Sequence, residues 1–206
     1  MAKIGIIDYG SGNLHSVVNA LNYIGADSFI SGDVKELEKA DSLILPGVGA
    51  FPDAAELLES SGIKDFVLSE TKKKPLLGIC LGMQLLFSRS WEFRMCEGLD
   101  LIKGEVIKLK AGENDKRYKI PHIGWNAIKT VNENPLTKGI DDGSCFYFVH
   151  SYMGTCENNV QLYAVTEYGE DVTAIVGDGY VYGTQFHPEK SGEAGLRLLK
   201  NFVSLV

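Results

Sequence analysis

A chain of 206 residues has the length of one ordinary α/β domain, and its 45% apolar content is typical of a folded protein. A net charge of −7 and the absence of a basic run argue against a nucleic-acid partner, whose phosphates select for lysine and arginine. No stretch reaches the roughly 20 apolar residues that span a bilayer, and the N-terminal apolar run is too short for a signal peptide. We therefore expect a cytoplasmic protein with no membrane contact.

The first half of the chain alternates between strand and helix patterns. Strands are predicted at 4–8, 42–46 and 75–79, and helices at 13–24, 53–60, 63–71 and 82–87. Gly25 follows the first helix at the position where a left-handed residue commonly ends one. Strands that alternate with helices usually build a parallel sheet with helices on both faces, so we expect that arrangement here.

The second half contains short β-rich segments separated by turns of glycine, asparagine and aspartate. They cover 104–110, 125–131, 145–151, 161–167, 172–176 and 180–185, and a final helix is predicted at 192–205. We expect these segments to extend the same sheet in an antiparallel manner. Because the chain shows no internal repeat and no linker, the predicted fold is a single α/β domain over residues 1–206, with a mainly parallel central sheet.

The four cysteines do not form a metal or redox motif. Cys80, Cys96, Cys145 and Cys156 include no Cys-x-x-Cys pair, which excludes a zinc knuckle and a thioredoxin-type motif. Disulfides are rare in the cytoplasm, so we expect one chemical cysteine and three structural or incidental ones. The chain also lacks a Walker A motif, a clear dinucleotide fingerprint and a cluster with metal-ligand spacing, so no metal and no cofactor is predicted.

The chemical cysteine is predicted to be Cys80. It lies in Gly78-Ile-Cys80-Leu-Gly82, between a predicted strand and a predicted helix, which is the setting of a nucleophile elbow with cysteine in place of serine. The glycines allow a tight turn, and the N-terminus of the following helix favours a thiolate. The alternative is a cysteine that is merely buried beside a strand, because cysteine is common in protein cores.

A cysteine nucleophile needs a base, and the four histidines are His15, His122, His150 and His187. His187 follows a β-rich run in Gln185-Phe-His-Pro-Glu189, where Glu189 can orient the imidazole as the acid of a catalytic triad does. The alternative is a histidine–proline turn without chemical meaning. His15 lies in a predicted helix and is expected at the surface or in packing.

The segment Pro46-Gly-Val-Gly49 follows a predicted strand and can expose backbone N–H groups to an oxyanion. Many turns use glycine for steric reasons alone, so this segment has an ordinary structural explanation as well.

Together these segments resemble the triad class, or class I, of glutamine amidotransferases, which have a flavodoxin-like α/β fold. Gly78-Ile-Cys-Leu-Gly-Met-Gln84 and Gln185-Phe-His-Pro-Glu189 carry the resemblance, which covers essentially the whole chain. Within the class, the chain is similar to the glutaminase subunits of imidazole glycerol phosphate synthase. That narrower similarity is carried by Asp8-Tyr-Gly-Ser-Gly-Asn13, Pro46-Gly-Val-Gly-Ala-Phe51, Pro121-His-Ile-Gly-Trp-Asn126, Phe146-Tyr-Phe-Val-His-Ser-Tyr152 and Glu189-Lys-Ser191.

The resemblance implies a role for each matching residue. The catalytic triad would be Cys80, His187 and Glu189. The oxyanion hole would be formed by backbone N–H groups among Val48, Gly49 and Leu81. Glutamine would be bound by Gly49, Gln84, Glu92, Ser151 and Tyr152, although Ser88-Arg-Ser-Trp91 departs from the acidic run usual before Glu92. Trp125, Tyr147 and Lys190 match interface or gating positions, whereas residue type alone favours core packing for Trp125 and Tyr147.

The resemblance also implies a partner. Subunits of this family hydrolyse L-glutamine and pass ammonia to a (β/α)8-barrel cyclase, with which they form a heterodimer in histidine biosynthesis. The cyclase acts on a phosphoribosyl-formimino aminoimidazole ribonucleotide and makes imidazole glycerol phosphate and an aminoimidazole carboxamide ribonucleotide. Two alternatives are kept open. One is a paralogous pair whose ammonia amidates a surface sugar, for which the Trp91 region is the one local hint; the other is a flavodoxin-like binding module in which Cys80 is only buried.

Overall fold

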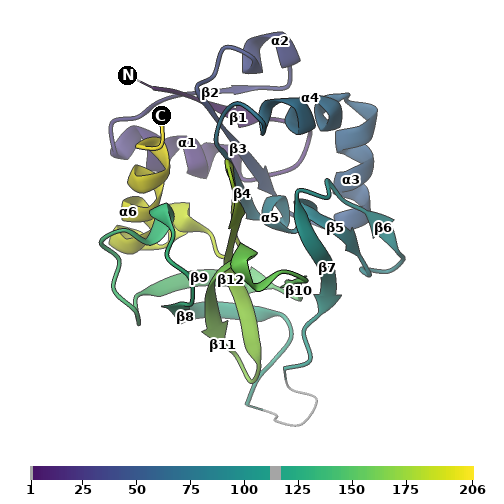
Figure 1. The fold of residues 1–206 in the computed structure, drawn as a ribbon, viewed down its shortest axis with the longest axis vertical. Coiled ribbons are helices and arrows are strands. Elements are labelled where there is room, and N and C mark those ends of the chain that lie inside the picture. Colours follow the sequence, from purple (N-terminus) through teal and green to yellow (C-terminus); the bar gives the residue numbers. More distant parts are fainter. Residues whose placement is uncertain (1, 112–116) are drawn as a thin grey trace.

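Nine strands form the main sheet of the protein. They are β1 (Lys3–Ile7), β2 (Asp27–Ser31), β3 (Ser42–Gly47), β4 (Leu76–Cys80), β8 (His122–Thr130), β9 (Cys145–His150), β11 (Leu162–Glu167), β12 (Asp171–Asp178) and β13 (Val181–Thr184). The computed structural model describes residues 2–111 and 117–206, and its strand order across this sheet is β2-β1-β3-β4-β13-β12-β11-β8-β9. The order places β4 beside β13, far away in sequence, near the centre of the molecule (Figure 1).

The half of the sheet from β2 to β4 is parallel, as predicted, and β13 adds a further parallel strand beside β4. One face is covered by α2 (Val34–Leu37), α3 (Phe51–Ser60), α4 (Ile63–Glu70) and α5 (Leu81–Leu85), and the other by α1 (Leu14–Tyr23) and α6 (Gly192–Val203). Figure 1 shows α1 and α6 grouped on one side of the strands and α3 and α4 on the other. With both faces covered, β3 and β4 are buried along their whole length, which explains their unbroken apolar sequences.

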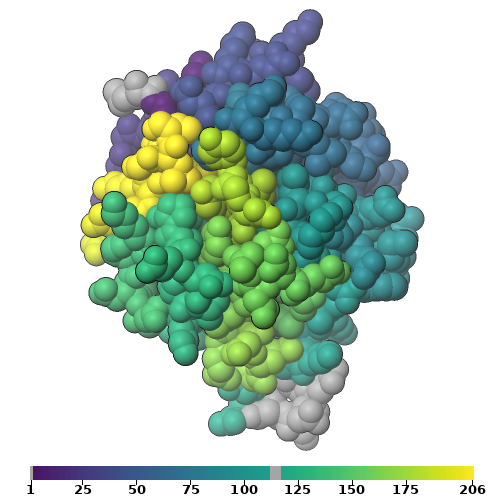
Figure 2. Space-filling view, in the orientation of Figure 1, coloured from purple at the N-terminus to yellow at the C-terminus, as the bar shows by residue number. Residues whose placement is uncertain are grey.

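The other half of the sheet is antiparallel. β13 pairs with β12, β12 with β11, β11 with β8, and β8 with β9. The predicted antiparallel extension is therefore confirmed for 125–131, 145–151, 161–167 and 172–176, whereas 180–185 joins it only through β12, because β13 is parallel to β4. In the space-filling view these strands (green) lie beside the C-terminal helix α6 (yellow) (Figure 2). The described residues also form three short 3-10 helices: η1 (Pro135–Thr137), η2 (Asn159–Gln161) and η3 (Pro188–Lys190).

The prediction that 104–110 extends the main sheet is wrong. β7 (Ile102–Lys108) lies in a second sheet of order β10-β7-β5-β6, with β5 (Phe87–Ser90), β6 (Cys96–Glu97) and β10 (Tyr152–Cys156). The helix predicted at 82–87 ends at Leu85 because the chain turns into β5 there. The Phe87 ring fills the space over Gly154, where a Cβ would lie 2.2 Å from the ring, so this second sheet depends on a close packing that strand patterns do not reveal.

Two further features bear on the site. The chain crosses from the main sheet to the second sheet at Ser151, the single residue between β9 and β10. Edge strand β2 was not predicted, because its five residues alternate too weakly in polarity and are mostly half-buried. In the part of the chain that the structure describes, no helix has the length and apolar character needed to cross a membrane.

Candidate active site

Cys80 lies at the end of β4 in a backbone conformation that L-residues rarely adopt. Its φ is 56° and its ψ is −111°, and α5 begins at the next residue. Two glycines make this turn possible. A Cβ on Gly78 would lie 2.7 Å from the carbonyl oxygen of Gly82, and a Cβ on Gly82 would lie 1.8 Å from that of Leu45. Strain at such a residue costs about 1–3 kcal/mol and is typical of functional turns, so the geometry is that of a nucleophile elbow.

His187 lies three residues after the end of β13, close enough to Cys80 for the sulfur to raise its pKa. The contact arises because β13 and β4 are parallel neighbours, so their carboxyl ends meet at one edge of the sheet. On its other side, Nδ1 of His187 lies 2.8 Å from Oε1 of Glu189. The two side chains are only 3% and 1% exposed. The structure thus brings His187 close to both Cys80 and Glu189, as a catalytic triad of these three residues would require.

The surroundings of His187 favour its protonated form. Burial lowers the pKa of His187, but hydrogen bonds and charges from Cys80 and Glu189 outweigh burial and raise that pKa to about 9. The imidazolium lies between a sulfur and a carboxylate, both of which stabilise its positive charge. Such a group can donate a proton to a leaving group while the sulfur acts as the nucleophile.

Ser191 fixes the His187 loop to β9, a role that the sequence did not reveal. Its hydroxyl donates to the His187 carbonyl at 2.6 Å and accepts from the Tyr147 N–H at 3.0 Å. The His187 N–H in turn donates to the Tyr147 carbonyl at 3.0 Å. Both backbone groups of His187 are therefore tied, directly or through Ser191, to one residue of β9.

A cavity of about 320 Å³ opens onto Cys80 and His187. It is lined by Val48, Gly49, Cys80, Leu81, Gln84, Glu92, Pro121, Val149, His150, Ser151, Tyr152 and His187. Every residue that the family resemblance assigned to the oxyanion hole or to glutamine is in this set, and Glu189 lies behind His187. The volume suits a small polar ligand.

Glu92 is held at the cavity wall by the start of α3. Its Oε2 accepts a hydrogen bond of 2.7 Å from the N–H of Phe51, the first residue of that helix. The side chain is buried, and burial raises the pKa of Glu92 although the Phe51 bond opposes the shift. With Oε2 held by the backbone, Oε1 is the oxygen left for a cationic group in the cavity, such as an amino group.

Gln84 projects from α5 and is fixed by two acceptors. Its Nε2 donates to the Tyr152 carbonyl at 2.9 Å and to Oε1 of Gln185 at 3.1 Å. Both N–H groups are thereby used, so the amide oxygen is the atom available to a ligand. Gln185 is fully buried, with its Nε2 3.9 Å from the Cys80 sulfur. No role was predicted for Gln185, although it stands two residues before His187.

The predicted oxyanion donors differ in their availability. Leu81 is the first residue of α5, and the N–H of a first helical residue has no partner within its helix. The N–H of Val48 instead donates to Oγ of Ser11 at 3.4 Å, and the Ser11 hydroxyl donates to the Val48 carbonyl at 2.6 Å. Ser11 does not line the cavity. One predicted donor is therefore held by a serine outside the site.

Trp125 and Tyr147 lie across from each other on β8 and β9, with ring centroids 6.1 Å apart. Trp125 is 58% exposed and Ile123 is 59% exposed, so core packing, which residue type favours for Trp125, is wrong. Lys190 is exposed in η3. We call Ile123, Trp125, Tyr147 and Val149 the apolar stripe, because cross-strand pairing places Ile123 opposite Val149 in the same way. The stripe ends at the cavity, where the Val149 carbonyl lies 3.9 Å from the Cys80 sulfur.

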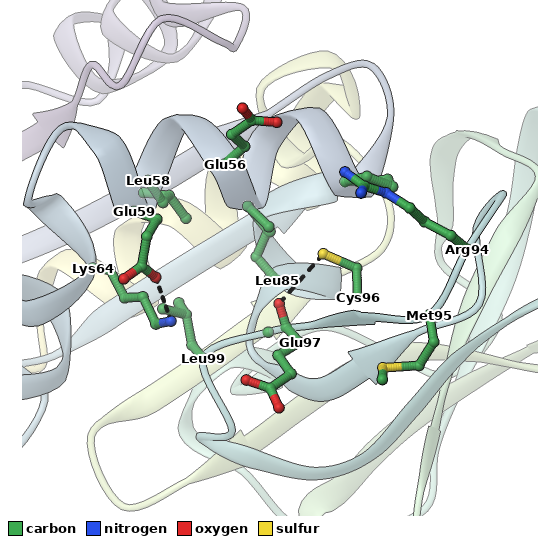
Figure 3. A pocket seen from close by; sticks show the side chains of 13 residues that line it. Glu56, Leu58, Glu59, Lys64, Leu85, Arg94, Met95, Cys96, Glu97 and Leu99 are labelled. Carbon is green, nitrogen blue, oxygen red and sulfur yellow. Dashed lines mark hydrogen bonds and ion pairs between the residues drawn. The ribbon is translucent and has the colours of Figure 1, made fainter.

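The remaining cysteines and His15 lie outside this cavity. Cys96, Cys145 and Cys156 are free thiols, and His15 is exposed. A larger cavity, of about 580 Å³, lies between α3 and the segment 94–99 and shares no lining residue with the first (Figure 3). There Lys64 pairs with Glu59, and Cys96 contacts the Glu97 carbonyl (Figure 3). Within the described residues, no group of three or more potential metal ligands is found in either place.

Comparisons with known proteins identify the family of the chain. The model of the class I glutamine amidotransferase family matches residues 5–205. The chain is 50% identical to imidazole glycerol phosphate synthase subunit HisH of Bacillus thuringiensis (strain Al Hakam), over 98% of this chain and 95% of that protein. It is 51% identical, with the same coverage, to the HisH subunit of Bacillus cereus (strain G9842). The solved structure of PurLQS from Thermotoga maritima has the same fold, with a TM-score of 0.76, 19% identity, and coverage of 100% of this chain and 99% of that one.

The family match spans nearly the whole chain, and half of the residues are identical to HisH subunits over almost their full length. The protein therefore belongs to the class I glutamine amidotransferases and, within them, to the family of HisH subunits.

Proposed function

We propose that this protein is the glutaminase subunit of an imidazole glycerol phosphate synthase, with Cys80, His187 and Glu189 as its catalytic triad. The observation that carries the proposal is the single cavity in which Cys80 and His187 meet the residues expected to bind glutamine. The identity of about half the chain to HisH subunits supports the choice of acceptor pathway.

The reaction follows from the residue types in the cavity. The Cys80 thiolate attacks the side-chain carboxamide carbon of glutamine, and the carbonyl oxygen becomes an oxyanion. The His187 imidazolium gives its proton to the departing nitrogen, so ammonia leaves and a γ-glutamyl thioester remains. Neutral His187 then takes a proton from water, whose oxygen attacks the thioester and releases glutamate. The imidazolium and the thiolate are restored at the end, and Glu189 stabilises the imidazolium throughout.

Substrate orientation follows from the contacts around the cavity. The free oxygen of Glu92 suits the α-amino group of glutamine, which is a cation at neutral pH. The amide oxygen of Gln84 accepts a further hydrogen bond from the ligand. Ser151 and Tyr152 also line the cavity. These groups leave the carboxamide end of the substrate to meet Cys80.

Regulation is expected at Val48. The oxyanion needs two donors, each worth roughly 3 kcal/mol, and the Val48 N–H is held by Ser11. Glycines on both sides of Val48 make rotation of the intervening peptide sterically cheap. We therefore expect the isolated chain to be a poor glutaminase that becomes active when a partner favours the rotated peptide. Ammonia would then be released only where an acceptor is ready.

The apolar stripe is the expected docking surface for a (β/α)8-barrel cyclase. Large exposed apolar side chains such as Ile123 and Trp125 are typical of subunit interfaces. The stripe also leads to the Cys80 cavity, so a partner seated on it would receive ammonia at its source. In the partner, ammonia would convert the phosphoribosyl-formimino aminoimidazole ribonucleotide into imidazole glycerol phosphate and the aminoimidazole carboxamide ribonucleotide.

The test uses the chain purified with its native partner. Wild-type complex should form imidazole glycerol phosphate from either glutamine or an ammonium salt. Cys80→Ala should abolish the glutamine-dependent reaction and keep the ammonium-dependent one, because the variant removes only the nucleophile. Glutamine turnover near wild type in Cys80→Ala would refute the triad. A complex that ignores the ribonucleotide and amidates a sugar would refute the pathway while leaving the triad intact.

A further inference from the structure

Two buried histidines that the proposed reaction does not use meet at the wall of the active-site cavity. His122 begins β8 and His150 ends β9, and the two are direct partners in the strand register. They are 2% and 6% exposed. Nδ1 of His122 lies 3.1 Å from Nε2 of His150, and Nδ1 of His150 lies 2.8 Å from the Tyr152 carbonyl.

The direction of this hydrogen-bond chain follows from its last member. A carbonyl oxygen only accepts, so Nδ1 of His150 carries a proton and donates it to Tyr152. Burial lowers the pKa of His150 to about 3 and that of His122 to about 4, so both rings are neutral. Nε2 of His150 is then a bare acceptor, and Nδ1 of His122 must be its donor. The chain therefore runs in one direction, from His122 to His150 to the Tyr152 carbonyl.

The last bond of the chain spans the corner at Ser151, where the backbone leaves the main sheet and enters the second sheet. Ser151 and Tyr152 both line the cavity. The Tyr152 carbonyl also accepts from Gln84, so the corner and the amide of Gln84 share one acceptor. A shift of the Tyr152 carbonyl would therefore displace two parts of the ligand cavity together.

The His122 ring is itself held in place by aromatic neighbours. It stacks on Tyr168 at a centroid distance of 3.8 Å and on Phe148 at 4.9 Å, with interplanar angles of 19° and 15°. Two stacked faces fix the plane of the imidazole and aim its Nδ1 at His150. The donor is thus positioned before any ligand enters.

We propose that His122 and His150 are a positioning pair for glutamine: they hold the Ser151 corner in the shape that binds the substrate, without touching the reacting atoms. The proposal rests on the proposed glutaminase function. It predicts that loss of the His150 hydrogen bonds weakens glutamine binding selectively. Because Cys80 is anchored separately by β4 and α5, its intrinsic reactivity should be preserved.

The experiment measures how glutamine protects Cys80 of the full chain from alkylation by iodoacetamide. The alkylation rate without glutamine measures the reactivity of Cys80. The glutamine concentration that gives half-protection measures glutamine binding, which depends on the Ser151 corner. His150→Phe keeps the ring shape but removes both hydrogen bonds. It should raise the half-protection concentration about tenfold, as expected for loss of the one buried hydrogen bond that reaches the Tyr152 carbonyl, with the unprotected rate within about twofold of wild type.

Three matched variants sharpen the result. His150→Asn has an amide N–H that can replace Nδ1, so it should recover most of the protection. His122→Phe retains the aromatic stack and removes only the donor to His150, so it should give an intermediate loss and serves as the second variant if His150→Phe does not fold. His15→Phe changes an exposed histidine that does not line the cavity and should behave as wild type.

Unchanged half-protection in folded His150→Phe or in His122→Phe would overturn the positioning role. The proposal would also be overturned if protection by glutamine and the alkylation rate of Cys80 without glutamine fell by the same factor. Such a result would indicate general damage to the core. Failure of glutamine to protect the wild-type chain is a separate outcome and would refute the proposed function itself.

Discussion

The hydrogen bonds between Ser11 and Val48 lead to a prediction in which a mutation increases activity. Ser11 holds both backbone groups of Val48, and the N–H that it holds is an expected oxyanion donor. Ser11→Ala removes both hydrogen bonds and leaves the rest of the cavity unchanged, because Ser11 does not line it. The variant should therefore populate the rotated peptide more often than the wild-type chain does.

The expected size of the effect follows from the two bonds. A neutral hydrogen bond contributes about 1 kcal/mol net, and the contact of 3.4 Å is weaker than the contact of 2.6 Å. Removing both should shift the peptide equilibrium by about 1–2 kcal/mol, which corresponds to roughly a 5- to 30-fold change. An upper bound is about 10²- to 10³-fold, the rate effect of one oxyanion donor.

The assay is glutaminase turnover of the isolated chain and of the complex with its barrel partner. Ser11→Ala should raise turnover of the isolated chain by that factor and change the complex little, so stimulation by the partner falls. Ser11→Thr keeps a hydroxyl and should resemble wild type. Ser60→Ala removes another hydroxyl bonded to a backbone carbonyl, at the exposed last residue of α3, and serves as the control. Turnover of isolated Ser11→Ala at or below the wild-type level, with normal folding, would refute this reasoning.

Two further predictions concern the triad and the interface. His187 acts as a general acid when protonated, so kcat/KM should fall as pH rises through about 9. Glu189→Gln removes one cause of the raised pKa of His187, so in this variant kcat/KM should fall at a lower pH and kcat should be reduced. If kcat/KM of Glu189→Gln fell at the same pH as in wild type, Glu189 would have no influence on the pKa of His187. Trp125→Ala should weaken the complex by about 2 kcal/mol, or roughly 30-fold in Kd by calorimetry, whereas Trp91→Ala, at an exposed tryptophan outside the apolar stripe, should leave Kd unchanged. Equal losses in both variants would exclude the stripe as the docking surface.

The sequence was most informative where chemistry imposes strict local geometry. The glycines at 78 and 82 are needed because a side chain would overlap neighbouring backbone, so the elbow around Cys80 was recognisable before the fold was known. The parallel half of the sheet was predictable for a related reason, since strands covered on both faces are apolar throughout.

The parts that the sequence did not reveal depend on contacts between distant segments. Strand β7 has the pattern of an ordinary strand, and only its pairing with β5 and β10 assigns it to the second sheet. Trp125 resembles a core aromatic until the register of β8 places it beside the exposed Ile123. Gln185 and Ser191 act through hydrogen bonds to groups whose positions are set by the tertiary fold.

A partner bound to the apolar stripe can influence Val48 through residues that link the stripe to the cavity. Tyr147 belongs to the stripe, and its backbone also anchors His187, directly and through Ser191. Val149, the next stripe residue on that strand face, lines the same cavity as Val48 and Cys80. A partner that raises turnover by 10²- to 10³-fold through this route must bind the active form about 10²- to 10³-fold more tightly than the resting form. By reciprocity, Ser11→Ala, which favours the active form, should also tighten the complex by roughly 5- to 30-fold. An increase in turnover of isolated Ser11→Ala without tighter partner binding would place the coupling elsewhere in the molecule.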